Sequence, residues 1–292
     1  MNLYFHVNKT IFRLNYLYRK YFFYNYHVLS IQETIEFILE SDISISRFGD
    51  GEIRLISGES IEFQEYSEEI SLLLKKVLES DNNKFKVCVV DFFDRLNQYN
   101  KSEQYFWKKH LFSYYKVWQK NLTKERKYFN AYITRPYMPF ISKEFSKNTF
   151  IEFKKLWDNK HVLVVEGELT RFGVVNDLLN NAASVVRILC PKVNAFKKLD
   201  EIKNVIKSIY NGHLILLALG PTATILSFQL SNFGMRCIDI GHLDIEYEWF
   251  LRNATSKIEI KGKYTNEAVY DKSEIEDCFD QKYTDEILMR IN

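Results

Sequence analysis

The sequence predicts an α/β fold with a doubly wound, mostly parallel sheet flanked by helices. Short apolar runs that are typical of buried strands alternate with amphipathic segments of helical period, and the connections between them are short. Only 10 Gly and 4 Pro occur among the 292 residues, so few loops can be long and flexible. A chain of this length can bury the core of one large domain.

The first half of the chain holds the less regular elements. Ile35, Ile38 and Leu39 share one face of a helix that we expect over 32–40. The alternating residues 43–46 predict a short strand that leads into a glycine turn. The other elements of this half are a helix over 67–78, a buried strand over 85–90, an aromatic helical stretch over 101–120 and a strand-like segment over 128–134.

The second half alternates strands and helices more regularly. The expected strands are 161–165, 184–190, 214–219 and 236–240, and the expected helices are 173–179, 200–210 and 225–233. Ligands bind at the carboxyl ends of the strands in such sheets. We therefore expect the loops 166–173, 191–195, 220–224 and 241–248 to share one face and to form the site.

Composition excludes several classes of protein. A formal net charge of +2 gives no argument for a nucleic-acid partner. The four cysteines lack the C-x-x-C spacing of zinc sites, which predicts buried free thiols in a reducing, cytoplasmic compartment. They are Cys88, Cys190, Cys237 and Cys278.

The two ends of the chain differ from its middle. Residues 1–29 are basic and aromatic, and charges interrupt every apolar stretch, so a secretory signal or a membrane-spanning helix does not fit. Two interpretations stay open: a helix lying on the anionic inner face of a membrane, or a helix packed on the domain or on a partner subunit, as in a homo-oligomer. Residues 253–292 are charged and polar, and predict a peripheral helix or a partly disordered tail.

A glycine-flanked turn after the first strand carries two carboxylates, Asp50 and Glu52, two residues apart. This spacing lets both reach one hard cation, and Mn²⁺ and Mg²⁺ prefer oxygen ligands and keep part of their shell for phosphate. Gly49 and Gly51 allow the backbone to come close to a ligand. The alternative is a solvated turn whose acids have no role, but the turn is bracketed by arginines such as Arg47 and follows a strand, which argues against that alternative.

Three further segments carry candidate ligand contacts. The loop 220–224 offers free N–H groups at a helix start, which is a natural diphosphate cradle, although its threonines could instead cap the helix. Arg171 could pair with phosphate, or with Glu166 or Glu168 in a structural ion pair. Arg135, which precedes a proline, carries the same ambiguity.

The densest titratable cluster is His242 with Asp244, Glu246 and Glu248. A general base near neutral pH needs a histidine or a desolvated carboxylate. The three acids share one face of an extended segment, whereas only Asp244 and Glu248 do so in a helix. The alternative is an acidic helix start over an aromatic core. Together, the acidic clusters and glycine loops suggest metal-assisted chemistry on a phosphate-bearing substrate.

These segments together resemble the GT-D-type glycosyltransferases, a bacterial family first described as a domain of unknown function. The likeness covers residues 30–252 and departs from the pattern at Val175, where a glycine is expected before Asn176. The matching segments are 47–52, 134–137, 166–173 with 176–178, 190–191 with 194–196, 219–224 and 239–249.

The resemblance implies one Rossmann-like GT-D-type domain over 30–252, between the N-terminal extension 1–29 and the tail 253–292. It further implies a UDP-sugar donor and a divalent cation, Mn²⁺ or Mg²⁺, held through Asp50 and Glu52. His242, Asp244 or Glu248 would supply the acceptor base. The implied contacts to the nucleotide sugar are Arg47, Gly49, Gly51, Arg135, Glu168, Arg171, Asn194, Gly220, Pro221, Thr222, Thr224 and Glu246.

Known activity in this group is transfer of glucose onto the growing O-linked glycan of a bacterial surface adhesin. The resemblance thus predicts a metal-dependent transferase that moves a hexose, with glucose favoured, from a UDP-sugar to a glycan or glycopeptide in surface glycoprotein or polysaccharide synthesis. Two alternatives stay open: a metal-dependent hydrolase of nucleotide sugars, and a non-catalytic nucleotide-sugar-binding subunit of a glycosylation complex. Whether a transferase would invert or retain configuration is also left open.

Overall fold

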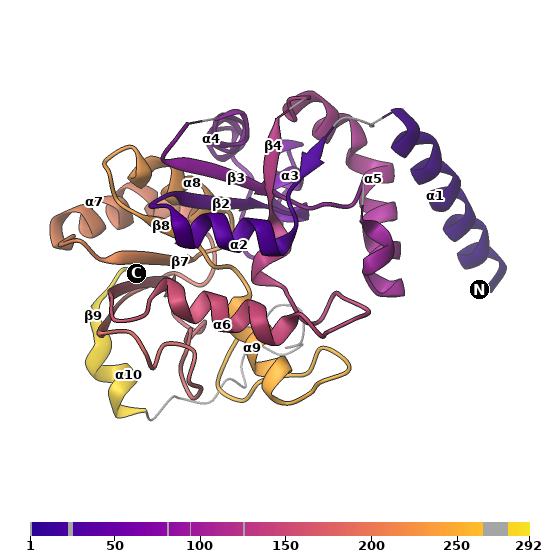
Figure 1. Cartoon of the computed structure of the whole chain (residues 1–292). Coiled ribbons are helices and arrows are strands. Elements are labelled where there is room, and N and C mark those ends of the chain that lie inside the picture. The colour runs from indigo at the N-terminus through magenta and orange to yellow at the C-terminus, as the bar shows by residue number, and fades with distance from the viewer. Residues whose placement is uncertain (1, 23–25, 81, 94, 125, 265–279) are drawn as a thin grey trace.

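A parallel sheet with helices on both faces organises the chain (Figure 1). The structure is a computed structural model that describes residues 2–22, 26–80, 82–93, 95–124, 126–264 and 280–292. The sheet has nine strands in these residues, and every pairing between neighbouring strands is parallel. The predicted doubly wound α/β fold is therefore confirmed.

The strand order in the sheet is β1-β4-β3-β2-β8-β7-β5-β6-β9. The strands are β1 (His27–Val28), β2 (Ser44–Phe48), β3 (Phe85–Val89), β4 (Lys127–Asn130), β5 (His161–Gly167), β6 (Ser184–Cys190), β7 (Leu214–Ala218), β8 (Cys237–Asp239) and β9 (Ile287–Arg290). The first half of the chain builds one side of the sheet and the second half builds the other. The halves meet where β2 pairs with β8, which is the topological switch point at which ligands bind in such folds.

The α-helices vary from six to 21 residues. They are α1 (Asn2–Phe22), α2 (Ile31–Glu40), α3 (Asp50–Ile56), α4 (Glu68–Glu79), α5 (Lys101–Asn121), α6 (Ser146–Leu156), α7 (Leu199–Ile209), α8 (Pro221–Ser231), α9 (Leu243–Leu251) and α10 (Gln281–Glu286). Short 3₁₀ turns are η1 (Leu96–Gln98), η2 (Ala131–Thr134) and η3 (Ala195–Lys198). In the part of the chain described, no helix is long and apolar enough to cross a bilayer.

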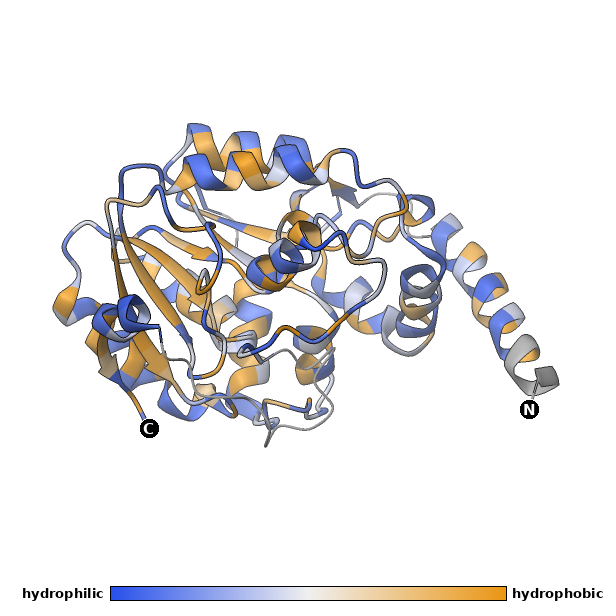
Figure 2. Cartoon of the chain, turned by 90° about the horizontal axis from the view of Figure 1, so that it is seen from below, coloured by the Kyte–Doolittle hydropathy of each residue, from blue (hydrophilic) through white to orange (hydrophobic). Residues whose placement is uncertain are grey.

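Local sequence explains why the elements begin where they do. Ser30 caps α2 in a reciprocal capping box with Glu33, and Ser67 and Asn100 cap α4 and α5 through their side chains. The central strands are apolar on both sides because helices cover both faces of a parallel sheet, and Figure 2 shows them as the hydrophobic centre of the molecule. β7 is buried along its whole length.

Three expectations for the elements were wrong. Residues 173–179 form turns and no helix, and Val175 in this segment has a left-handed φ of 62°. Only the first part of 128–134 is a strand, because the chain tightens into η2 after Asn130. Helix α8 begins at Pro221, four residues before the expected start, since proline fits the first turn of a helix.

The N-terminal segment forms the helix that both interpretations expected, whereas the tail contributes a strand that was not expected. Residues Asn2–Phe22 form helix α1, which packs on α5 (Figure 1). In the tail, β9 joins the edge of the sheet beside β6. The expected free thiols are confirmed for Cys88, Cys190 and Cys237, which are buried, whereas Cys278 lies outside the described residues.

Candidate active site

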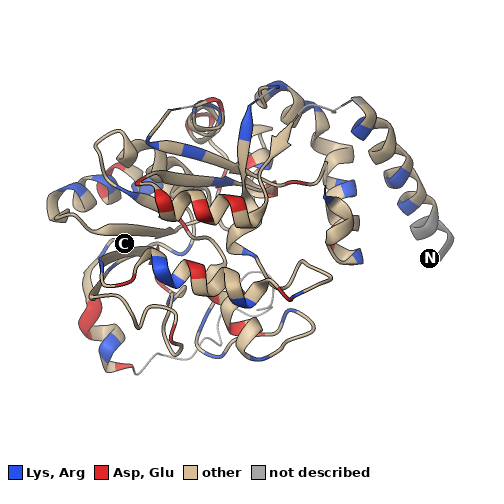
Figure 3. Cartoon of the chain, in the orientation of Figure 1, with Lys and Arg blue, Asp and Glu red and all other residues tan. Residues whose placement is uncertain are grey.

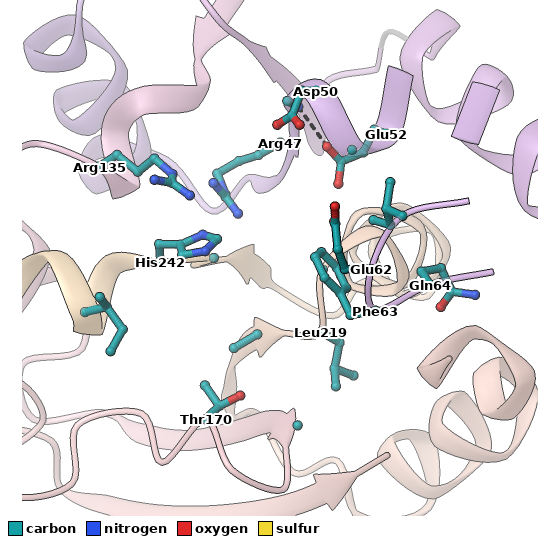
Figure 4. A pocket seen from close by; sticks show the side chains of 18 of the residues that line it. Arg47, Asp50, Glu52, Glu62, Phe63, Gln64, Arg135, Thr170, Leu219 and His242 are labelled. Atoms are coloured by element: carbon teal, nitrogen blue, oxygen red, sulfur yellow. Dashed lines mark hydrogen bonds between the residues drawn. The ribbon is translucent and has the colours of Figure 1, made fainter. Parts of the chain in front are cut away.

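A cavity of about 580 Å³ lies at the carboxyl ends of the strands. The cavity is lined by the end of β5 and by residues of the loops that follow β2, β3, β4, β6, β7 and β8. All four loops that were expected to share one face contribute to this lining, so that prediction is confirmed. Figure 4 shows the side chains of Arg47, Arg135 and His242 beside those of Asp50 and Glu52 in this cavity.

Arg47 at the end of β2 is held in place by Asp239 at the end of β8. The Nε and Nη2 atoms of Arg47 donate to Asp239 Oδ1 at 3.1 and 3.0 Å, and the backbone N–H of Arg47 donates to Oδ2 at 3.1 Å. Burial raises the pKa of the Asp239 carboxyl, and Arg47 acts against that rise. The pair fixes a cationic side chain at the switch point of the sheet.

Gly241 makes room for this arginine. Its φ is +42°, and a Cβ atom at this position would lie 1.7 Å from Arg47 Nη2. A glycine is therefore required here both by backbone conformation and by the guanidinium.

The carboxylates Asp50 and Glu52 both line the cavity, and both belong to the first turn of α3. Glu52 Oε2 accepts a hydrogen bond from the backbone N–H of Gly49 at 2.8 Å, which caps the helix. Burial raises the pKa of Glu52 to about 7, while the hydrogen bond from Gly49 acts in the opposite direction. A Glu with this pKa is poised between its neutral and charged forms at physiological pH.

The start of α8 also borders the cavity. Gly220, its N-cap residue, lines the cavity with φ +53°, and a Cβ atom there would lie 2.6 Å from Phe63 Cε2. Asn194 donates its backbone N–H to the Phe63 carbonyl at 2.8 Å, and its Oδ1 accepts from the N–H of Glu65 at 2.7 Å. Asn194 thus positions the loop that carries Phe63 and is not itself part of the cavity wall.

The remaining residues of the 220–224 loop lie beneath the cavity. Pro221, Thr222 and Thr224 are buried in the first turn of α8 and do not line the cavity. Thr224 Oγ1 donates to the carbonyl of Arg47 at 3.1 Å and contacts Asp239 Oδ2 at 3.3 Å. Neither threonine is the N-cap, because that position is Gly220.

Glu168 and Arg171 lie outside the cavity wall. The ion pair of Arg171 with Glu166 or Glu168 that the sequence suggested does not form. Glu166 pairs instead with Arg187 at 2.8 Å, and Glu168 pairs with Arg290 at 2.9 Å. Arg171 is buried and donates to the carbonyl of Gly262 at 2.7 Å. It connects the loop after β5 to the segment after α9.

The acidic run after β8 forms helix α9, and its N-cap is His242. Asp244 and Glu248 lie on one face, as expected for a helix, and share Lys263 Nζ at 2.7 and 3.1 Å. Lys263 and hydrogen bonds from Asn176 and Arg252 lower the pKa of Glu248 despite its burial, which acts to raise that pKa. Of the four residues in the cluster, His242 and Asp244 line the cavity.

Glu246 faces a different neighbour. Its Oε2 accepts the backbone N–H groups of Tyr137 and Met138 at 3.0 and 2.7 Å. It therefore anchors the chain just after Arg135, whose side chain lines the cavity. The role of Glu246 in the structure is to position that loop.

Several residues of this region were not singled out from the sequence. Asp239 and Lys263 are the buried partners of cavity residues, and only the tertiary structure brings them into contact. Glu103 and Trp107 on α5 also line the cavity, together with Tyr132, whose hydroxyl donates to Glu103. The aromatic character of 101–120 was the one sequence signal for this part of the lining.

Among the described residues, no group of three or more His, Cys, Asp or Glu is arranged to hold a metal ion by itself. A cation bound at Asp50 and Glu52 would thus take most of its ligands from elsewhere, such as phosphate oxygens and water.

Comparison with known proteins places the chain in a family. The family model described as "Glycosyltransferase GT-D fold" matches residues 45–268. A solved structure described as a domain of unknown function 1792 with a distinct glycosyltransferase fold superposes with a TM-score of 0.89 at 38% identity, over 92% of this chain and 96% of that one. A second, a glycosyltransferase from Streptococcus sanguinis, gives a TM-score of 0.88 at 37% identity, over 91% of this chain and 100% of that one.

Curated relatives agree with the structural neighbours. The chain is 39% identical to the probable glycosyl transferase Gly of Streptococcus gordonii and 36% identical to the glycosyltransferase GlyD of Streptococcus pneumoniae serotype 4. Each match covers 90% of the present chain. It spans only 39% and 32% of the length of these relatives. By its sequence, its fold and the position of its cavity, the chain belongs to the glycosyltransferase family with the GT-D fold.

Proposed function

We propose that the protein is a metal-dependent hexosyltransferase that uses a UDP-sugar, with UDP-glucose favoured, and a glycan or glycopeptide acceptor of the bacterial cell surface. The observation that carries the proposal is the convergence of two carboxylates, two arginines and a histidine in one cavity at the switch point of a glycosyltransferase fold. These residues are Asp50, Glu52, Arg47, Arg135 and His242.

Asp50 and Glu52 are the residues that would hold Mn²⁺ or Mg²⁺. The donor set fits such a cation, because both groups are carboxylates, both line the cavity, and Glu52 already has a raised pKa that a nearby positive charge would lower. A bound cation would neutralise the negative charge that develops on the diphosphate as the bond to the sugar breaks.

Arg47 and Arg135 are positioned to bind the diphosphate. Asp239 orients the Arg47 guanidinium, and Glu246 fixes the loop that follows Arg135. Charge-assisted hydrogen bonds from arginine to phosphate are stronger than neutral ones, and the positive end of the α8 dipole at Gly220 adds to them. These residues would therefore hold the leaving group and stabilise its charge.

His242 is the favoured acceptor base among the three candidates. Asp244 and Glu248 are both engaged by Lys263, and the pKa of Glu248 is lowered, which makes it a weak base. His242 lines the cavity, and an imidazole has an intrinsic pKa suited to accept a proton from an acceptor hydroxyl near neutral pH. Asp244 and Glu248 would instead fix the helix that carries His242.

The test is release of UDP from a panel of UDP-sugars by the purified full chain, with Mn²⁺ or with EDTA, and with or without a glycan acceptor. Metal-dependent release from one sugar that rises with acceptor supports the proposal. Release that acceptor does not change would indicate a hydrolase, and UDP binding without any release would indicate a binding subunit.

A further inference from the structure

Helix α1 packs along one face on α5 and on the loop that follows β3. Tyr16 donates its hydroxyl to the carbonyl of Phe92 at 2.7 Å, and the guanidinium of Arg19 lies 4.5 Å from the centre of the Tyr115 ring. The rings of Phe12 and Phe112 are 5.1 Å apart. These contacts fix which side of α1 faces the protein and which side faces solvent.

The solvent side of α1 is apolar and aromatic. Its exposed large side chains recur at intervals of three and four residues, which places them on one stripe of the helix. They are Val7, Ile11, Leu14, Tyr18 and Tyr21, with exposed fractions of 48, 44, 62, 65 and 79%, and Leu17, at 52%, lies at one edge of the stripe. Single exposed apolar residues need no explanation, but a continuous stripe on a helix indicates an interaction surface.

Positive charge borders this stripe. At 100° per residue, Lys9, Arg13 and Lys20 fall between the packed side of α1 and Leu17 at the edge of the stripe, and all three are exposed. Burial lowers the pKa of Lys108 on α5, and the charges of Arg13 and Lys9 lower it further, so these cations lie near one another. Together α1 and α5 carry nine Lys and Arg residues and one acid, Glu103, in a chain whose net charge is only +2.

We propose that the exposed face of α1, with the adjoining lysines of α5, docks on an anionic membrane surface. An apolar stripe bordered by basic residues is the arrangement by which helices lie in the headgroup region of a bilayer. Figure 3 shows basic residues and no acidic ones on α1. A second copy of the chain is a poorer partner, because it would bring two strongly basic faces together.

Docking at this surface would set the cavity beside the bilayer. The same helix α5 that supports α1 lines the cavity through Glu103, Phe106 and Trp107. Under the proposed function, the acceptor would then be met at the membrane surface. The docking itself needs no turnover, so it can be tested whether or not the transferase proposal holds.

The experiment is co-sedimentation of the full chain with vesicles of phosphatidylcholine alone and with vesicles of equal parts phosphatidylcholine and phosphatidylglycerol. We expect binding to the anionic vesicles that weakens as salt is added. Replacing two cations, Lys9→Gln with Lys20→Gln, should weaken affinity about 30-fold, since each basic residue near such a surface contributes about 1 kcal/mol. Lys76→Gln with Lys147→Gln, two exposed lysines on α4 and α6, is the matched control and should change nothing.

A second pair of variants tests the apolar stripe. Ile11→Ser with Leu14→Ser should reduce binding to anionic vesicles strongly, whereas Ile151→Ser with Leu72→Ser should not. The controls match in type and exposure, at 44% for both isoleucines and 57% against 62% for the leucines. Circular dichroism checks that each variant is folded.

Equal sedimentation with both kinds of vesicle would overturn the proposal, as would anionic binding that survives both changes in α1. Absence of vesicle binding together with a dimer that Ile11→Ser with Leu14→Ser dissociates would assign the face to a second copy and would overturn it as well.

Discussion

Arg47 and Asp239 are 192 residues apart in sequence, yet they form a buried ion pair across the two strands at which the halves of the sheet meet. The side chain of Asp239 is 3% exposed and that of Arg47 is 14% exposed. Because the same carboxylate also accepts the backbone N–H of Arg47, it joins β2 to β8 and aims a cation into the cavity. The stability of the sheet and, under the proposed function, the binding of the diphosphate therefore depend on one contact.

Asp239→Asn should lower the free energy of unfolding by about 3 kcal/mol, because it leaves a largely buried guanidinium without its counter-charge. Urea denaturation measures this change. Asp42→Asn is the matched control: Asp42 also pairs with an arginine, Arg236, at 3.3 Å, but its side chain is 97% exposed, so the loss should stay below about 1 kcal/mol. Equal losses in the two variants would contradict the structural role of Asp239.

Gly241→Ala should weaken UDP binding by about tenfold or more, because the new methyl group displaces the Arg47 guanidinium and its charge-assisted hydrogen bonds. Gly58→Ala controls for backbone strain, since Gly58 also has a positive φ, of +96°, with nothing within 4 Å of an added Cβ. Calorimetric titration with UDP should find that variant unchanged. A Gly241→Ala protein with full affinity would mean that Arg47 does not contact the nucleotide.

The sequence predicted the fold and the place of the site because both follow from local pattern. Apolar runs and short loops predict parallel strands, and the carboxyl ends of such strands must meet at one edge. The roles of Glu246 and Asn194 could not be predicted, because each depends on which distant backbone group its side chain meets. The same holds for Asp244 and Glu248, because their common partner Lys263 lies in the segment for which the sequence predicts a peripheral tail.

His242→Ala should lower kcat by roughly 100-fold or more if His242 is the acceptor base, with UDP affinity retained. Steady-state kinetics and calorimetry together separate these effects. Glu248→Gln should instead act mainly on stability, because Glu248 is buried in ion pairs with Lys263 and Arg252. An unchanged kcat in His242→Ala would move the base to Asp244, which also lines the cavity.

His110 predicts a pH dependence of stability. It is buried on α5, accepts a hydrogen bond from Trp118 Nε1 at 3.0 Å, and its pKa is lowered from 6.5 to about 3, chiefly by burial and further by Arg54. Below pH 6.5 the unfolded chain takes up a proton that the folded chain resists, so this contribution is complete above pH 6.5 and is lost as pH falls toward about 3.

Between about pH 6 and about pH 4, the wild-type protein should therefore lose about 1 kcal/mol per pH unit more than His110→Gln, which keeps a hydrogen-bond acceptor. Urea denaturation at several pH values gives the two slopes. Parallel slopes would show that folding does not lower the pKa of His110.

Under the proposed function, the cavity binds a nucleotide diphosphate through a cation held by Asp50 and Glu52. The most direct measurement is the affinity for UDP by calorimetry, with Mn²⁺ and with EDTA, for the wild-type protein and for Asp50→Asn. We expect tight binding that requires Mn²⁺ in the wild type and that is weak in Asp50→Asn with or without Mn²⁺, at an unchanged melting temperature. Binding of UDP that is equally tight with EDTA, or that survives Asp50→Asn, would contradict it.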